Sequence, residues 1–250
     1  MTIASDVRAA TEPCSAIVLG STGNVGRQIV NLLIESPAAS QVVVVNRRQT
    51  DGFKNAPKVR EVVVPDMIGL ADAVESAVRE TGAIVGFCAI GVGKGSRTMP
   101  EAQVRRIEVE YPEAFARGCK AGGVLSLGLM TAAGADVRSS FAYVRTIGEK
   151  EAAVINAGIA KLGIYKPSVI YGNSNTPAYL DRIFPAFEWL LPSRFHGIHK
   201  NELACAMFEG TLDALEEAKR ELDHNGEHAR PQVMFYEYRD MKPLFSRRTS

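Results

Sequence analysis

The chain has 250 residues, 46% hydrophobic and 23% charged, which is usual for a globular protein of one large domain or two small ones. Its net charge of +1 gives no overall attraction to nucleic acid, and we expect no nucleic-acid partner. Four widely spaced cysteines without a Cys-x-x-Cys pair argue against a zinc site or a redox dithiol. No apolar run reaches the roughly 18 residues that suggest a membrane span, and no targeting segment is recognisable, so we expect a cytoplasmic location by default.

A glycine-rich turn follows the first predicted strand. Residues 16–19 are small or apolar, and Gly20, Gly23 and Gly26 then recur before an apolar helical pattern. Glycine permits a tight turn where a side chain would collide, and the first turn of a helix presents unpaired N–H groups to an anion. The order strand, turn, helix therefore predicts a site for a dinucleotide pyrophosphate, although a glycine turn without a ligand is the alternative. The expected contacts are Gly20, Thr22, Gly23, Asn24 and Val25.

Strands and helices alternate along the next 150 residues. The predicted strands are 41–45, 59–64, 83–90, 124–129 and 163–170. The predicted helices are one that ends at Ser36-Pro37, then 70–79, 99–121 and 141–161. Within the third helix, Pro112 should cause a kink or an interruption. This alternation predicts an α/β fold with a Rossmann-type, doubly wound parallel sheet.

The character of the chain changes after about residue 172, which predicts a smaller C-terminal lobe that covers the cofactor domain and supplies substrate contacts. Residues 179–191 are rich in aromatic side chains, 201–222 have a helical pattern, and 233–238 could form a last short strand. The predicted organisation is a flexible arm at 1–15, a single domain at 16–240 with its substrate lobe mainly at 173–240, and a tail at 241–250.

The end of the second predicted strand indicates which nucleotide is preferred. A carboxylate usually stands there and binds the adenosine ribose, but this strand ends in Asn46, Arg47 and Arg48. Because guanidinium groups match the geometry of phosphate, the two arginines favour NADP(H) over NAD(H), unless they are only a solvated loop. Asp66 is a candidate acceptor for the adenine amino group, and small residues at Ala89 and Gly91 permit close approach of the cofactor.

Several short motifs together resemble the atypical short-chain dehydrogenase/reductase family, and within it the Tat-interacting oxidoreductase subgroup. They are residues 20–26, 46–48, 87–91, 134–136, Tyr143 with Gly148-Glu149, and 166–169. The resemblance covers about residues 16–210 and implies a single NADP(H)-binding α/β domain with a small variable C-terminal lobe. It also implies that Arg47 and Arg48 hold the 2′-phosphate and that Pro167, Ser168 and Val169 line the nicotinamide pocket.

Enzymes of this family use a tyrosine, a lysine four residues later and a serine or threonine hydroxyl. A nearby cation is needed because a phenol ordinarily titrates near ~10. Here Tyr143 matches the tyrosine and Thr131 is the candidate hydroxyl, but Ile147 replaces the lysine. Lys150 lies about two helical turns after Tyr143, too far along to take the usual place.

Two functions fit this departure. The first is an NADP(H)-dependent oxidoreductase that reduces a small carbonyl compound of unknown identity with Tyr143 as the acid. The second is a non-catalytic NADP(H)-binding regulatory or scaffold protein that acts through a protein partner. No metal site is expected, because Asn225-Gly226 breaks the helical spacing between His224 and His228.

Overall fold

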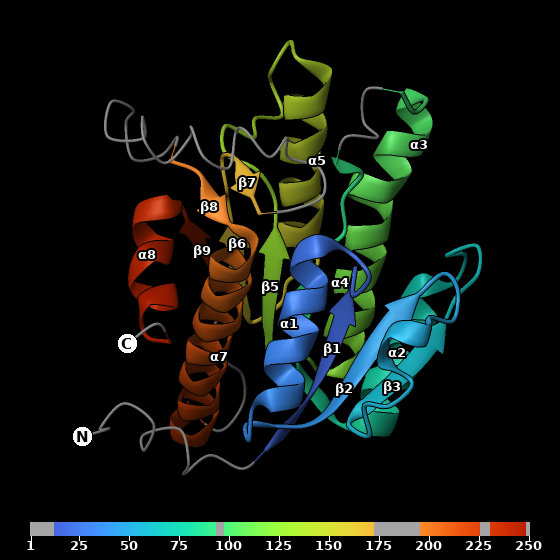
Figure 1. Ribbon diagram of the computed structural model, residues 1–250, viewed down its shortest axis with the longest axis vertical. Helices are drawn as coiled ribbons and strands as arrows, with labels where there is room; N and C mark the ends of the chain where they lie inside the picture. Colours follow the sequence, from blue (N-terminus) through green and yellow to red (C-terminus); the bar gives the residue numbers. More distant parts are fainter. Residues whose placement is uncertain (1–12, 94–97, 173–195, 226–230, 249–250) are drawn as a thin grey trace.

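The computed structural model describes residues 13–93, 98–172, 196–225 and 231–248, and its centre is a seven-stranded parallel sheet (Figure 1). The strand order is β3-β2-β1-β4-β5-β6-β9. Successive strands are therefore added on one side of β1 up to β3 and on its other side from β4 onward, so the strand order reverses between β1 and β4. The predicted Rossmann-type doubly wound sheet is confirmed. The seven strands are β1 Cys14–Leu19, β2 Ala39–Asn46, β3 Val59–Val63, β4 Ala83–Cys88, β5 Ser126–Met130, β6 Lys161–Tyr165 and β9 Gln232–Tyr236. A second, two-stranded parallel sheet joins β7 Ile170–Tyr171 to β8 Ile198–His199.

Helices cover both faces of the main sheet. One face is covered by α1 Asn24–Glu35 and α7 Lys200–Asn225, with α8 Tyr238–Ser246 beside α7 (Figure 1). The other face is covered by α2 Leu70–Thr81, α4 Tyr111–Gly122 and α5 Ala142–Asn156. Successive side chains of a strand point to opposite faces, so Ala16 and Val18 pack toward α1 while Ile17 and Leu19 pack toward α2. Both sets are fully buried, which explains why the strands are apolar without alternation.

The helical stretch around Pro112 is interrupted as its sequence predicts. It divides into α3 Glu101–Arg105, a π-helical turn at Arg106–Glu110 and α4, in whose first turn Pro112 lies. Proline lacks the N–H that would bond the carbonyl of Glu108, and its ring would collide with that carbonyl in a regular helix. The wider π turn accommodates this conflict, and Glu108 is buried at this turn.

Several element boundaries differ from the sequence prediction. The strand expected over 163–170 is β6, which runs from Lys161 to Tyr165, and Ile170 belongs to the separate strand β7. The helix expected over 141–161 ends at Asn156, because Gly158 adopts a left-handed conformation (φ 72°) and the next strand begins at Lys161. Residues 241–246 belong to α8 rather than to a free tail, because Met241, Leu244 and Phe245 are buried against the core. The aromatic stretch 179–191, most of the expected 1–15 arm and His228 lie outside the described residues.

The described C-terminal residues join the main fold. α7 packs on β5 and β6, and β9 extends the sheet beside β6. None of the described helices is long and apolar enough to cross a membrane.

Candidate functional site

Two adjoining hollows lie at the carboxyl ends of the central strands. The first hollow, about 260 Å³, extends from the glycine turn to Asn46 and Arg47 after β2. The second hollow, about 360 Å³, extends from the start of α1 to Tyr143 on α5. Their shared lining residues are Gly23, Ala89, Ile90, Gly91 and Val92. The two hollows therefore form one continuous depression at the carboxyl ends of β1 and β4, where the strand order reverses. Open α/β sheets bind their ligands at this point.

The glycine turn is shaped by close backbone contacts. Gly20 has φ 91°, and a Cβ there would lie 2.7 Å from the backbone of Ala89. A Cβ on Gly26 would overlap the carbonyl oxygen of Gly20. Gly23 donates its N–H to Gly20 over 3.0 Å, which closes the turn, and α1 begins at Asn24 without a side-chain cap. The first turn of α1 thus offers its N–H groups and positive dipole end to an anion.

A third hollow surrounds the predicted arginine pair. Arg47 and Arg48 are exposed, and they line it together with Thr22 and Thr50. The Thr50 hydroxyl is buried but has no hydrogen-bond partner in the described part of the chain. An unpaired hydroxyl is costly unless a ligand satisfies it, so this hollow suits an anion such as a phosphate.

Asn46 occupies the place where a ribose-binding carboxylate is usual. Its Oδ1 accepts a 2.8 Å hydrogen bond from Ser21 Oγ, and its Nδ2 donates over 2.6 Å to Glu61 Oε1. Glu61 also accepts the N–H of Thr50 at 3.1 Å. Asn46 therefore ties the glycine turn to β3 and the arginine loop.

Tyr143 lies in the first turn of α5 and lines the second hollow, with its side chain 43% exposed. Partial burial, and secondarily the negative charge of Glu108, raises the pKa of Tyr143 to about 12. Ile147, one turn later, is buried and lines the same hollow. The hydroxyl of Tyr143 is therefore protonated at neutral pH. Ile147 occupies the position beside it at which the family has a lysine.

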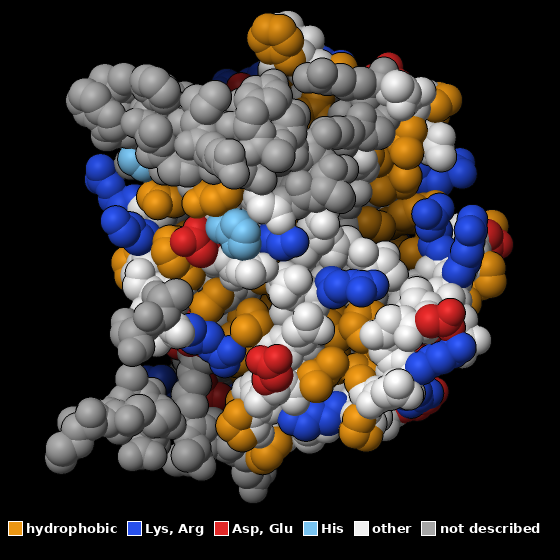
Figure 2. Space-filling view, in the orientation of Figure 1, with side chains coloured by type: hydrophobic (Ala, Val, Ile, Leu, Met, Phe, Trp, Pro, Cys, Tyr) orange, Lys and Arg blue, Asp and Glu red, His pale blue; other side chains and the backbone are white. Residues whose placement is uncertain are grey.

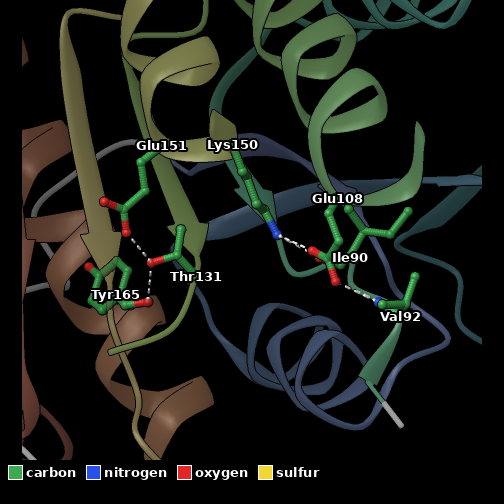
Figure 3. Close-up of polar contacts among 7 residues, drawn as sticks. All are labelled: Ile90, Val92, Glu108, Thr131, Lys150, Glu151 and Tyr165. Atoms are coloured by element: carbon green, nitrogen blue, oxygen red, sulfur yellow. Dashed lines mark hydrogen bonds and ion pairs between the residues drawn. The ribbon is translucent and has the colours of Figure 1, made fainter. Parts of the chain in front are cut away.

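Thr131 follows β5 directly and lines the second hollow. Its hydroxyl donates to Glu151 Oε1 over 2.8 Å (Figure 3). Lys166 donates to the other oxygen of Glu151 over 2.9 Å. The Tyr165 carbonyl oxygen, 3.4 Å away, is a second and more distant acceptor for the same hydroxyl, so its one proton is directed mainly at Glu151. In this arrangement Thr131 faces the hollow without a proton to give to a carbonyl.

Lys150 is the cation that the second hollow does contain. Figure 3 shows its ammonium extended from α5 toward Glu108, and its side chain is 2% exposed. Lys150 Nζ donates to Ile90 O over 2.9 Å and lies 3.2 Å from Glu108 Oε2. Glu108 Oε1 accepts the N–H of Val92 over 2.8 Å. The pair thus anchors the segment that both hollows share.

Most predicted site residues line the depression, but Arg48 lines only the third hollow, and Val169 and Asp66 line none of the described hollows. Pro167 and Ser168 line the second hollow, whereas Val169 uses its carbonyl to bond Ile198. Asp66 is exposed, accepts the N–H of Ile68 over 3.0 Å and lines none of the described hollows. The neighbouring Met67 lines the first hollow instead.

Sequence reasoning missed the site role of Glu108 entirely and set Lys150 aside. Lys150 could have been found, because seven residues from Tyr143 is two turns on the same helix face. For Glu108 the sequence offered only indirect evidence, namely that it lies four residues before Pro112, where an interruption of the helix was expected.

Comparison with known proteins gives relatives over most of the chain. The chain is 27% identical to the protein HTATIP2 of Rattus norvegicus over 160 residues, which span 62% of each chain. It is 26% identical to "FMP52-1, mitochondrial" of Scheffersomyces stipitis over 237 residues, 93% of this chain and 99% of that one. No protein-family model matches the chain.

Solved structures confirm the fold. WbmG of Bordetella bronchiseptica in complex with NAD aligns with a TM-score of 0.64 at 10% identity, covering 96% of this chain and 90% of that one. MoeE5 in complex with UDP-glucose and NAD aligns at 0.59 with 17% identity, covering 90% and 86%. The expected resemblance to the atypical short-chain dehydrogenase/reductase family is confirmed. The individual proteins to which the chain is similar include HTATIP2 and the FMP52 proteins.

These relatives contradict one expectation. The cytoplasmic location was inferred only because no targeting segment was recognisable, and it is wrong on this comparison because the FMP52 relatives are named mitochondrial.

Proposed function

We propose that this protein binds NADP(H) and is an oxidoreductase that reduces a small carbonyl compound, with Tyr143 as the acid. The observation that carries the proposal is the continuous depression from the arginine pair, across the uncapped start of α1, to Tyr143. Along the depression the arginine pair comes first, the start of α1 second and Tyr143 last. This order matches the 2′-phosphate, the pyrophosphate and the nicotinamide of NADP(H). Two structural neighbours, MoeE5 and WbmG in complex with NAD, support a nicotinamide nucleotide in general, and the arginines support NADP(H) in particular.

The residues fit this cofactor at two points. The N–H groups of α1 and the glycine turn suit the pyrophosphate, and Arg47, Arg48 and the unpaired Thr50 hydroxyl suit a 2′-phosphate. When bound, the reduced nicotinamide of NADPH would supply a hydride to the carbonyl carbon. Tyr143 then donates its hydroxyl proton to the carbonyl oxygen, while the surrounding walls exclude part of the solvent.

A second candidate function is favoured by Ile147. A buried isoleucine at the family's lysine position leaves no positive charge there to lower the pKa of Tyr143, which burial and then Glu108 raise to about 12. In this alternative the protein binds NADP(H) without turnover and acts on a protein partner. Replacing Tyr143 with phenylalanine separates the two, because only an enzyme loses carbonyl reduction.

The experiment that tests the cofactor is a fluorescence titration with NADPH and with NADH. We expect tighter binding of NADPH, and Arg47→Ala or Arg48→Ala should weaken it about tenfold or more, with little effect on NADH. Arg239→Ala is the matched control, because Arg239 is exposed on α8 and lines none of the described hollows. Equal affinity for both nucleotides would contradict the phosphate assignment, and binding of neither would contradict the proposed function.

The names of the FMP52 relatives also support a mitochondrial location for this chain. Fractionation of cells expressing the full chain tests it, and recovery in the cytosolic fraction alone would contradict it.

A further inference from the structure

The second hollow contains a buried ion pair that the proposed function does not use. Lys150 and Glu108 have side chains only 2% and 3% exposed, and they come from different helical segments. Isolated buried charges are expensive, and a pair is retained at such a place only with good geometry and additional hydrogen bonds. Both partners have such bonds, because Lys150 donates to Ile90 O and Glu108 accepts from Val92.

The location of the pair connects it to the ligand. Lys150 and Glu108 both line the second hollow beside Tyr143, and the backbone groups that they hold belong to the segment shared with the first hollow. Gly91 lies at the centre of this segment, where a Cβ would come within 3.2 Å of Glu108 Oε1. Any dinucleotide that occupies both hollows must cross this segment.

The donor count of Lys150 leaves one N–H group for a ligand. An ammonium has three donors, of which one is directed at Ile90 O and one at Glu108. Glu108 cancels the positive charge, so the pair as a whole attracts no anion. A neutral oxygen, such as a sugar hydroxyl, is the partner that this balanced arrangement suits. The charge at the opposite end of the depression differs, since Arg47 and Arg48 there are exposed.

We propose that Lys150, held by Glu108, is the positioning cation of the second hollow and binds a ribose hydroxyl of the nucleotide in place of a lysine at position 147. The proposal rests on the proposed function, because it requires a nucleotide in the second hollow. It assigns this task to a side chain two turns after Tyr143 instead of one.

Nucleotide affinity of paired variants tests the proposal. Lys150→Met alone leaves the Glu108 carboxylate buried and unpaired, which endangers folding. The double variant Lys150→Met/Glu108→Gln removes both charges and keeps the volume. We expect it to remain folded and to bind NADPH about tenfold more weakly than the wild type, because it lacks the ammonium donor. Adding Ile147→Lys to the double variant should restore part of the affinity.

The matched control is Lys161→Met. Lys161 is also a buried lysine paired with carboxylates, Glu217 and Glu221, but it lies at the amino end of β6, whereas the site lies at the carboxyl ends of the strands. Its loss should lower stability without changing NADPH affinity.

The outcomes separate the inference from the proposed function. If the wild type binds NADPH and the double variant binds it equally well, Lys150 has only a structural role and the inference is overturned. If the wild type binds no nucleotide, both the proposed function and the inference fail. Weakened binding in the double variant, partial recovery with Ile147→Lys and unchanged binding in Lys161→Met together support the assignment.

Discussion

Thr131 donates its hydroxyl proton to Glu151 over 2.8 Å, so the residue that follows β5 faces the second hollow while its donor is already in use. Lys166 holds the other oxygen of Glu151, which fixes the carboxylate in place. The hydroxyl therefore stabilises the end of β5 against α5. If Thr131 is structural, removal of its hydroxyl should lower stability and leave turnover unchanged. If it is catalytic, the same change should lower turnover and leave stability unchanged.

We expect Thr131→Val to lower the free energy of unfolding by about 1–3 kcal/mol, because Glu151 loses a buried donor. NADPH affinity and carbonyl turnover should change little. Thr131→Ser is the control, since it retains the hydroxyl. Urea unfolding and a turnover assay on the same preparations check this, and a tenfold loss of turnover at unchanged stability would show that the hydroxyl serves the substrate.

The pKa of Tyr143 leads to a prediction about pH. An ordinary phenol is half ionised near pH ~10, whereas partial burial and Glu108 raise the pKa of Tyr143 to about 12. The folded protein therefore retains this proton where the unfolded chain loses it. The contribution of Tyr143 to stability is complete below pH ~10 and is lost as pH rises toward about 12.

Phenolate absorbance, taken as the difference between the wild type and Tyr143→Phe, measures this titration. We expect almost no Tyr143 phenolate at pH ~10 in the folded protein. Glu108→Gln should lower the pKa of Tyr143, because it removes the nearby negative charge. A half-ionised Tyr143 at pH ~10 in the folded wild type would contradict the environment described for it.

The sequence predicted the parallel sheet and the glycine turn after its first strand because these depend on local patterns. Val42 to Val45 are consecutive β-branched residues, and Gly20, Gly23 and Gly26 lie in one turn between a strand and a helix. Such features involve residues that are close in the chain, so their spacing is sufficient to identify them.

The Tyr143 end of the site could not be predicted in the same way, because it depends on contacts between distant segments. Glu108 meets Lys150 only when α5 packs beside the π-helical turn, 42 residues away in the chain. Similarly, only the folded arrangement brings Glu151 to Thr131, so that the hydroxyl donates to this carboxylate. Whether Asp66 faces a ligand also depended on its turn with Ile68, which residue type alone does not determine.

Gly20→Ala tests the shape of the glycine turn. Its φ of 91° is strained for alanine, and the added Cβ would lie 2.7 Å from the backbone of Ala89. We expect a loss of about 2–4 kcal/mol in the free energy of unfolding and no measurable NADPH binding. Gly134→Ala is the control, because Gly134 has φ 78° but nothing lies within 4 Å of an added Cβ, so only the conformational strain of about 1 kcal/mol applies. Similar losses in both variants would show that the close approach to Ala89 is unimportant.

Thr50→Val tests whether the unpaired hydroxyl serves a phosphate. The substitution keeps the shape of the side chain and removes a buried oxygen that has no partner in the described structure. Without nucleotide we expect the free energy of unfolding to stay the same or to rise by up to about 1 kcal/mol, because no hydrogen bond within the described residues is lost. With nucleotide, NADPH affinity should fall about three- to tenfold while NADH affinity is unchanged, since only NADPH carries the 2′-phosphate. Calorimetric titration with both nucleotides measures the ratio, and equal changes for NADPH and NADH would place the Thr50 hydroxyl outside the phosphate site.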